Sequence, residues 1–211
     1  MRYTPYTMAV ILQKDAPVLR AQAQPVNPKD FGSARLKKII IDMKTALNKE
    51  EDGVAIAAPQ IGVPLRIFVV SHRAFEFKDE PQETELSVSI PSPIPPETSG
   101  KKQENSAKDM VFINPEITKL SRKKVWLPEG CLSVRWLYGE VSRAGKATIR
   151  AYDEHGKLFT RGGGGLLSQI FQHETDHLNG ILFIDRAQNI EVITKEDQER
   201  MRREDEKNNH E

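Results

Sequence analysis

The feature that constrains this chain most is the sequence His173-Glu174-Thr175-Asp176-His177, which lies inside a segment with the apolar period of a helix. Around it, apolar residues recur at helical spacing until Asn179-Gly180 ends the run, namely Leu166, Leu167, Ile170, Phe171 and Leu178. Two histidines four positions apart lie one helical turn from each other, so both imidazoles can bind one metal ion while Glu174 reaches its water. The alternative is a pair of surface histidines satisfied by neighbouring acids, which the placement inside a helix disfavours.

A tetrahedral ion held by two histidines needs one more protein ligand if its fourth position is to hold water. The candidates are the single cysteine, Cys131, and a carboxylate such as Asp176 or Asp185. Asp176 is the weaker choice, because one helical turn cannot easily direct three ligands at one ion. A lone cysteine is more often buried core than ligand. However, Cys131 follows Gly130 in a loop that can bend sharply toward another element, and the identity of the third ligand stays open at this point.

Length and composition predict one globular domain with peripheral additions. The chain has 211 residues, of which 38% are hydrophobic and 29% are charged, as in ordinary soluble proteins. A net charge of +1 supplies no strong field to gather nucleic acid or an anionic membrane, so we expect neither a membrane contact nor a direct nucleic-acid site. The start of the chain lacks the pattern of a secretion signal, and a single cysteine cannot form an internal disulfide. We therefore expect a cytoplasmic location.

Hydrophobic periodicity predicts two helices and several short strands. An amphipathic helix is predicted between Asp30 and Asp52, where apolar residues recur at three- and four-residue steps. Glycines at 162–165 are expected to break the strand pattern before the second helix. Strands are predicted at Ile67–Val70, Met110–Ile113, Lys123–Trp126, Ala147–Tyr152, Lys157–Thr160 and Ile181–Ile184. The predicted fold class is α+β, with short, mostly antiparallel strands around a central metal-binding helix and an N-terminal helix alongside.

Two segments differ in composition from the rest of the chain. Residues 71–109 are rich in Glu, Lys, Ser and Pro, and we expect a solvated surface insertion, because proline cannot donate hydrogen bonds to a sheet. A passive loop is the simpler interpretation of this insertion, and a docking segment is the alternative. Residues 187–211 are largely charged and lack a sustained apolar stripe, so we expect a solvated tail or a frayed helical extension.

Three segments together resemble the signature motifs of the peptide deformylase family and occur in that family's order. They are Gly53-Val-Ala-Ile-Ala-Ala-Pro-Gln60, Glu129-Gly-Cys-Leu-Ser133 and His173-Glu-Thr-Asp-His177. H-E-x-x-H alone occurs in many metalloproteases, whereas a Glu-Gly-Cys-Leu-Ser loop upstream of it is far more particular. The resemblance implies a catalytic domain at 1–186 that carries the insertion at 71–109 and is followed by the tail at 187–211.

The resemblance implies a metal-dependent hydrolase that removes the N-formyl group from the N-terminal methionine of newly made polypeptides and releases formate. The implied metal ligands are Cys131, His173 and His177. Glu174 would act as general base and then as general acid, while the Gln60 side chain and the Leu132 backbone N–H would stabilise the oxyanion. The resemblance favours Fe²⁺ as the single divalent ion, although a thiolate and two imidazoles also suit Zn²⁺, Ni²⁺ or Co²⁺.

The resemblance also implies contacts between the substrate and Val54, Ala55 and Gly130. The chain departs from the family pattern at Ala55, where the family usually has glycine, and the extra methyl group would narrow the peptide groove. The extended stretch around Val54 would pair with the substrate backbone as an added strand. The implied partners are N-formylmethionyl nascent polypeptides, with a transient contact to the ribosome.

Three other functions are compatible with parts of the sequence. A zinc endopeptidase would use the same H-E-x-x-H chemistry, but no third histidine follows at the spacing of the metzincins, and the other ligand candidate is an upstream cysteine. A deformylase-like binding protein without turnover would need a blocked groove, for example through Ala55 or the insertion. A purely structural metal site would normally be closed by a fourth protein ligand, and none is evident in the sequence.

Overall fold

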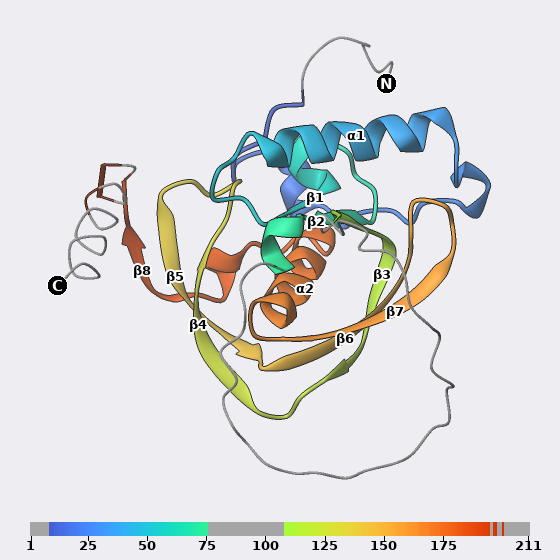
Figure 1. Cartoon of the computed structure of the whole chain (residues 1–211). Helices are drawn as coiled ribbons and strands as arrows, with labels where there is room; N and C mark the ends of the chain where they lie inside the picture. The colour runs from blue at the N-terminus through green and yellow to red at the C-terminus, as the bar shows by residue number, and fades with distance from the viewer. Residues whose placement is uncertain (1–8, 76–107, 195, 198–199, 201–211) are drawn as a thin grey trace, which may run out of the picture.

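Antiparallel strands form two sheets in the part of the chain that the computed structural model describes, which is residues 9–75, 108–194, 196–197 and 200. The five-stranded sheet has the order β1-β2-β3-β6-β7, and the three-stranded sheet has the order β4-β5-β8 (Figure 1). Their bounds are β1 Ala55–Ala57, β2 Ile67–Val70, β3 Met110–Leu120, β4 Lys124–Gly130, β5 Leu137–Ala144, β6 Lys146–Tyr152, β7 Leu158–Gly164 and β8 Gln188–Val192.

Two α-helices accompany these sheets within the described residues, α1 at Ala34–Asn48 and α2 at Gly165–Leu178. Five short 3-10 helices connect the elements there, namely η1 Pro17–Arg20, η2 Pro28–Asp30, η3 Ala58–Ile61, η4 His72–Phe75 and η5 Phe183–Asp185. The mixture of helices with antiparallel sheets confirms the α+β class expected from the periodicity. None of the helices described is long and apolar enough to cross a membrane.

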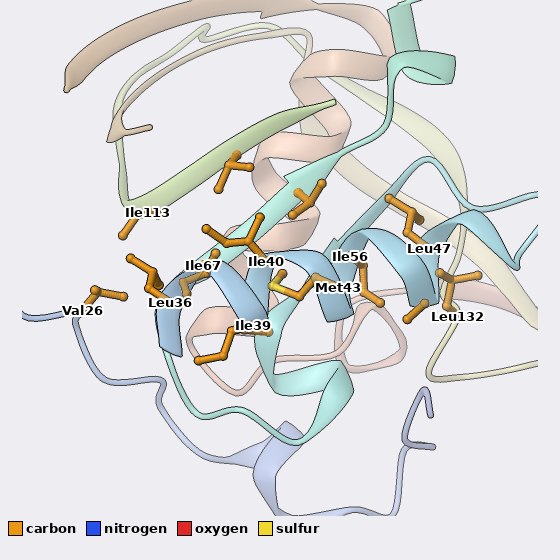
Figure 2. Close-up of a cluster of buried hydrophobic side chains, with 14 residues drawn as sticks. Val26, Leu36, Ile39, Ile40, Met43, Leu47, Ile56, Ile67, Ile113 and Leu132 are labelled. Atoms are coloured by element: carbon orange, nitrogen blue, oxygen red, sulfur yellow. The ribbon is translucent and has the colours of Figure 1, made fainter. Parts of the chain in front are cut away.

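Helix α1 forms because its apolar residues make one stripe and its first turn is capped. The Ser33 hydroxyl accepts a hydrogen bond from the Leu36 backbone N–H at 3.2 Å, which satisfies one of the unpaired donors at the helix start. Figure 2 shows the buried stripe of α1 facing β1 and β2, where Ile40 and Met43 meet Ile56 and Ile67. Helix α1 thereby fixes the position of the chain that leads into β1.

Helix α2 lies against strands of both sheets, including β1, β6 and β7 of the large sheet and β5 of the small one. Its Ile170, Phe171 and Leu178 pack into a second buried cluster that contains Phe68 and Phe112. The Phe112 ring stacks on Phe68 with 4.5 Å between centroids, and it meets Phe171 at 5.5 Å. The helix ends where predicted, since Asn179 caps it and Gly180 adopts a positive φ of 74°.

Local turn chemistry carries the chain from β6 into β7. The Asp153 carboxylate accepts hydrogen bonds from the backbone N–H groups of His155 and Lys157, both at 2.9 Å. Gly156 has a φ of 80°, which glycine adopts without steric cost. The resulting β6–β7 hairpin leads directly into α2, so the hairpin fixes where that helix begins.

The structure corrects two expectations about local structure and adds one strand. Ile181–Ile184 is not a strand but the approach to η5, where Leu182 and Phe183 are buried. The glycines at 162–164 do not end the strand, because β7 continues through them and pairs with β6 from Lys146 to Thr148. Strand β5 at Leu137–Ala144 was not expected from the sequence, and it pairs along its length with β4.

Two predicted segments fall mostly outside the described residues. Of the expected insertion at 71–109, the structure describes only its two ends, which meet where Asp109 accepts a hydrogen bond from the His72 backbone N–H at 3.0 Å. Of the expected tail at 187–211, it describes β8 and a few residues beyond. Strand β8 pairs with β5 through Tyr138 and Glu191, and all of its residues are exposed. The division into a catalytic domain, an insertion and a tail stays a prediction.

Candidate metal centre

Helix α2 presents both histidines of the H-E-x-x-H motif on one face. The His173 and His177 rings approach edge to face with 4.9 Å between their centroids. Glu174 lies between the two histidines in the sequence, and its side chain is buried. Its Oε2 has no hydrogen-bond partner within the described part of the chain. Burying a carboxylate oxygen without a hydrogen-bond partner costs folding free energy. Such an oxygen is typical of a site where a ligand or substrate supplies the missing partner.

Cys131 reaches these histidines from the loop that follows β4. Its Sγ lies 3.1 Å from His177 Nε2, and it accepts hydrogen bonds from the Ser133 backbone N–H at 3.4 Å and from Gln60 Nε2 at 3.6 Å. Cys131, His173 and His177 each offer one ligand atom, and these atoms all lie within 4.8 Å of one another. The described residues contain no other such group of three.

These residues fit a single divalent ion. Ligands at about 2.0–2.3 Å from one tetrahedral ion lie roughly 3.5 Å apart, close to the separation seen between the cysteine sulfur and the His177 nitrogen. One thiolate and two imidazoles form a donor set suited to Fe²⁺, Zn²⁺, Ni²⁺ or Co²⁺. Three protein ligands leave a fourth position for water or substrate, as in catalytic rather than structural sites. The unpartnered oxygen of Glu174 lies next to His173 in the helix and can serve that open position.

The two carboxylates considered as third ligands have other partners. Asp176 Oδ2 accepts a hydrogen bond from Arg143 Nη1 at 2.6 Å and lies 3.2 Å from Arg186 Nη1. Asp185 Oδ2 pairs with Arg20 Nη1 at 2.5 Å and accepts from the Leu182 backbone N–H at 2.9 Å. The geometry therefore favours Cys131, which the sequence spacing left open.

A buried ion-pair network supports the first histidine. Glu129 Oε2 lies 3.1 Å from His173 Nδ1, and both oxygens of the Glu129 carboxylate accept hydrogen bonds from Arg143 at 2.7 and 2.9 Å. Only 2% of the Arg143 and Glu129 side chains is exposed. Burial alone would raise the pKa of Glu129, but Arg143 and His173 lower it to about 2. Glu129 is therefore ionised and accepts the His173 Nδ1–H, so His173 can offer Nε2 to a metal once that nitrogen has lost its proton.

Three further groups of the site, Cys131, His173 and Glu174, have perturbed pKa values in the protein without an ion. Burial lowers the pKa of His173, but Cys131 and Glu129 outweigh burial and raise it well above its usual value. Burial raises the pKa of the Cys131 thiol, but the imidazoles of His177 and His173 outweigh burial and lower it to about 5. Burial raises the pKa of the Glu174 carboxyl to about 7, although the neighbouring histidines act in the opposite direction. The cysteine is thus prepared to bind a cation as a thiolate.

Gln60 belongs to the same site through η3. Its Oε1 accepts a hydrogen bond from the Ala57 backbone N–H at 2.7 Å, which fixes the orientation of the amide. Its Nε2 donates to Ser133 Oγ at 3.1 Å and faces Cys131 Sγ. Leu132 follows Cys131 in the same loop and is buried against the α1 cluster. The sequence-predicted residues Gln60 and Leu132 therefore lie beside the candidate metal ligands.

A cavity of about 400 Å³ opens onto this site. The predicted substrate contacts Val54, Ala55 and Gly130 line it together with Gln60, Leu132 and Glu174, while α2 contributes Leu166, Ile170 and His173. Ala55 also belongs to the buried cluster around Phe68, so its methyl group packs partly into the core.

The cavity is also lined by residues that the sequence analysis does not identify, among them Arg135, Tyr138 and Gln169. Tyr138 and Gly130 are paired residues of β5 and β4, and a Cβ added to Gly130 would meet the Tyr138 ring at 2.5 Å. This contact could be predicted from the sequence only if β5 and its pairing with β4 were known. A glycine is required at position 130 because the Tyr138 ring lies over it.

An H-E-x-x-H helix faced by a cysteine from a strand-end loop, below a cavity, is the arrangement of a mononuclear metallohydrolase. The family model described as polypeptide deformylase matches residues 8–192, and the chain therefore belongs to the peptide deformylase family. This membership confirms the family and the enzyme class that the three sequence motifs indicate.

Individual relatives agree with the family assignment. The chain is 37% identical over 177 residues to peptide deformylase 1A, chloroplastic/mitochondrial, of Arabidopsis thaliana, with 83% of this chain covered and 60% of that longer protein. It is 34% identical over 187 residues to the peptide deformylase of Chloroflexus aurantiacus, with 87% and 88% covered. The crystal structure of a peptide deformylase from Legionella pneumophila has 33% identity and a TM-score of 0.66, with 87% of this chain and 88% of that chain covered.

Proposed function

We propose that this protein carries out its reaction with one divalent metal ion held by Cys131, His173 and His177, and with Glu174 as the residue that transfers protons. The overall reaction follows from the family: the N-formyl group of newly made polypeptides is hydrolysed and formate is released. The observation that supports these residue roles most strongly is the convergence of the three ligand atoms beside the buried, unpartnered oxygen of Glu174.

In the reaction, water adds to the formyl carbon and the bond between that carbon and the amine nitrogen breaks. A divalent ion supplies Lewis acidity, which acidifies water and polarises the formyl carbonyl. Glu174 accepts the proton of the attacking water and later gives a proton to the departing amine, which must be protonated to leave. The helical backbone of α2 places Glu174 beside His173, on the element that carries both histidine ligands.

Gln60 and Leu132 are the proposed donors to the oxygen on which negative charge develops. The Gln60 amide is oriented by Ala57, so its Nε2 stays beside the cysteine sulfur on the cavity side. The Leu132 N–H belongs to the residue after Cys131 and so lies in the same loop. Loss of one such donor typically costs on the order of 3 kcal/mol of transition-state stabilisation.

The cavity supports an extended peptide as the substrate. Val54, Ala55 and Gly130 are the proposed contacts for its backbone, and Leu166 and Ile170 the proposed apolar contacts for the methionine side chain. A crystal structure of a class I type b peptide deformylase from Acinetobacter baumannii, 27% identical with a TM-score of 0.65, has Met-ala-ser bound. The small formyl group should be required, so formyl-Met peptides should be cleaved much faster than acetyl-Met peptides, and equal rates would contradict this arrangement.

The decisive experiment is formate release from formyl-Met-Ala-Ser by anaerobically prepared, iron-loaded protein and its Glu174→Gln variant. The isosteric amide should keep the bound iron but lose nearly all formate release, because it cannot accept a proton. Glu191→Gln, an exposed change on β8, is the matched control and should behave as the unchanged protein. A variant that retains full activity would overturn the role of Glu174. Cleavage within the peptide instead of at its formyl group would identify an endopeptidase.

Fe²⁺ is the ion we propose, and the cysteine ligand gives a test of it. A thiolate beside a redox-active ion can be oxidised to sulfenic acid and beyond, and it then ceases to be a ligand. The iron-loaded protein should lose activity within hours in air while its Cys131 gains oxygen by mass spectrometry, whereas the nickel- or zinc-loaded protein should not. Unchanged activity and an unmodified Cys131 in the aerated iron form would contradict the proposal.

The remaining parts of the functional proposal concern place and partners. We assign catalysis to 1–186, with 71–109 as an insertion and 187–211 as a tail, and we propose a cytoplasmic enzyme that meets nascent chains during a transient contact with the ribosome. Cosedimentation with ribosomes that carry nascent chains, compared with empty ribosomes, tests the last point. Recovery of the protein only in the supernatant, with both kinds of ribosome, would contradict the proposed contact with the ribosome.

A further inference from the structure

Two turns are joined by hydrogen bonds at the ends of the strands that link the two sheets. One turn, Ser121 to Lys123, connects β3 to β4, and the other, at Gly145, connects β5 to β6. The Ser121 backbone N–H donates to Lys146 O at 2.9 Å, and Ser121 Oγ accepts from the Lys146 N–H at 3.0 Å. The Gly145 N–H donates to Lys123 O at 3.1 Å. These bonds fix the two turns relative to each other.

Five exposed cationic side chains lie on these turns and on the strand ends beside them. These residues, called the basic patch below, are Lys119, Arg122, Lys123, Lys124 and Lys146. Lys119 pairs across the strands with Thr148, and Lys146 lies two residues from Thr148 on β6, so both side chains face the same side of the large sheet. Within the part of the chain that the structure describes, none of the five is paired with a carboxylate.

Few carboxylates surround the basic patch. Three stretches that form the sheets around the two turns contain no aspartate or glutamate, namely 117–128, 141–152 and 157–172. The acid that precedes the first stretch is Glu116, which pairs with Arg150 at 2.7 Å. The acid that precedes the second is Glu140, which accepts a hydrogen bond from Asn189 and keeps its negative charge. Five cations against Glu140 still leave an excess of positive charge in this region, which the net charge of +1 for the whole chain conceals.

An exposed aromatic ring adjoins the basic patch. Trp126 follows Lys124 by two residues on β4, so the two side chains face the same side of the small sheet. Of Trp126, 52% is exposed. A flat ring beside cations is typical of proteins that bind RNA, where the cations contact phosphate groups and an unpaired base stacks on the ring.

A membrane surface fits the same region less well. Segments that bind a bilayer bury apolar side chains in it, whereas the β3–β4 turn consists of Ser121, Arg122 and Lys123. The apolar residue beside the turn is Leu120, which pairs with the buried Ala147 and therefore faces the core side of the large sheet. The turn thus presents charge without an apolar wedge.

We propose that the basic patch and Trp126 form a binding surface for RNA. None of these residues lines the catalytic cavity, so RNA and a formyl peptide occupy separate sites. Strand β4 runs from the basic patch at Lys124 to the cavity at Gly130, roughly 20 Å at 3.3 Å per residue. The inference rests on the proposed function in one respect, because an enzyme that meets nascent chains at the ribosome meets ribosomal RNA there.

The test measures how the full chain binds a fluorescein-labelled RNA hairpin with a loop of unpaired adenines, by fluorescence anisotropy at several salt concentrations. Arg122→Gln/Lys123→Gln/Lys124→Gln should weaken binding at least about tenfold. This triple variant should also reduce the slope of log K against log salt concentration by about two, because each phosphate contact of a single strand contributes roughly 0.7. Trp126→Ala should weaken binding about fivefold or more and leave the slope unchanged, because stacking on a base releases no counterion.

A charge-matched variant is the control. Lys29→Gln/Arg35→Gln/Lys37→Gln removes three charges from exposed positions in η2 and the first turn of α1, well away from the β3–β4 turn (Figure 1), and should keep the RNA affinity. Both triple variants should release formate from formyl-Met-Ala-Ser at the unchanged rate, since neither alters the cavity. Equal RNA affinity of the two triple variants would overturn the proposal.

Two further probes distinguish RNA from other polyanions. Polyglutamate has charges but no bases, so at equal charge concentration it should displace the hairpin much less than unlabelled RNA does. Equal displacement would instead indicate an acidic protein partner, and binding to phosphatidylserine vesicles without affinity for the hairpin would indicate a membrane. An unchanged protein that releases formate but does not bind the hairpin would refute this inference alone, whereas RNA binding without formate release would count against the proposed function.

Discussion

Glu129 of one sequence motif holds His173 of another, with 3.1 Å between the glutamate Oε2 and the imidazole Nδ1. Glu129 is the penultimate residue of β4, two residues before Cys131, and His173 lies within α2. The same carboxylate therefore ties the strand that presents the thiol to the helix that presents the imidazole. The distance between the proposed metal ligands depends on this contact as well as on the backbone of each element.

Replacing Glu129 with glutamine should weaken metal binding without removing any ligand. The amide can present its NH₂ group instead of an oxygen to Nδ1, so the ring is no longer held as an Nδ1–H donor, and such outer contacts typically contribute about 10–100-fold in metal affinity. Competition with a chelator, read as bound metal per chain, measures the change. Glu140→Gln, which is exposed on the adjacent β5, serves as the control. Equal affinity in Glu129→Gln and the unchanged protein would show that Glu129 does not position His173.

Replacing Arg143 with methionine should strongly destabilise the fold. Arg143 is paired with Glu129 and Asp176, and its removal leaves the buried Glu129 carboxylate without a guanidinium partner and Asp176 with Arg186 alone. Breaking a buried ion pair on one side costs about 3–5 kcal/mol of unfolding free energy, which urea denaturation of the metal-free protein can measure. Arg150→Met removes an exposed arginine from its pair with Glu116 and should cost about 0–1 kcal/mol. Similar losses in the two variants would contradict a special role for the buried network.

The contact between Gly130 and Tyr138 predicts a coupling between two substitutions. In Gly130→Ala, the new Cβ would stand 2.5 Å from the Tyr138 ring, so the ring or the Cys131 loop must move. We expect Gly130→Ala to lower kcat/KM at least tenfold, and Tyr138→Ala to restore much of the loss in the double variant because the obstacle is gone. Additive effects of the two changes on kcat/KM and on thermal stability would show that contact with the Tyr138 ring is not the reason why position 130 requires glycine.

The sequence predicted the elements whose pattern is local. Helix α1 and the helix that carries His173 have a clear apolar period, and the end of the second helix follows from Asn179 and Gly180. The fold class and the meeting of Cys131 with the histidines were also expected, the latter through the family resemblance. These features depend on residues that are close in the sequence, or on motifs whose residues bind a metal or take part in catalysis in the family.

Features that depend on distant neighbours could not be predicted in the same way. Strand β5 was missed because its buried positions include Gly139 and Arg143, which are not residues that mark a core strand. Arg143 is buried only because Glu129 and Asp176 meet it from two other elements. Ile181–Ile184 has the composition of a strand but pairs with no strand among the described residues, and Leu182 and Phe183 pack with Leu19 and Val141 instead.

Removing the metal should make Cys131 unusually reactive at moderately acidic pH. With a thiol pKa lowered to about 5 by the adjacent imidazoles, the cysteine of the metal-free protein is already a thiolate near neutral pH. Because the thiolate is the reactive form, its alkylation rate with iodoacetamide should hardly change between about pH 6 and pH 8, whereas an ordinary cysteine with a pKa of about 8.5 gains nearly tenfold per pH unit. Urea-unfolded protein supplies that ordinary reference.

The chain has one cysteine, so mass spectrometry assigns every alkylation event to Cys131. Loading with Ni²⁺ should protect it, because the sulfur lone pairs and the approach from the cavity are then occupied by the ion. His177→Ala should raise the thiol pKa back toward its usual value and restore a steep pH dependence in the metal-free protein, since the imidazole that lies 3.1 Å from the sulfur is gone. A rate that rises steeply from pH 6 in the unchanged metal-free protein would mean that the imidazoles do not stabilise the thiolate, and the cysteine would then have to lose its proton only when the metal binds.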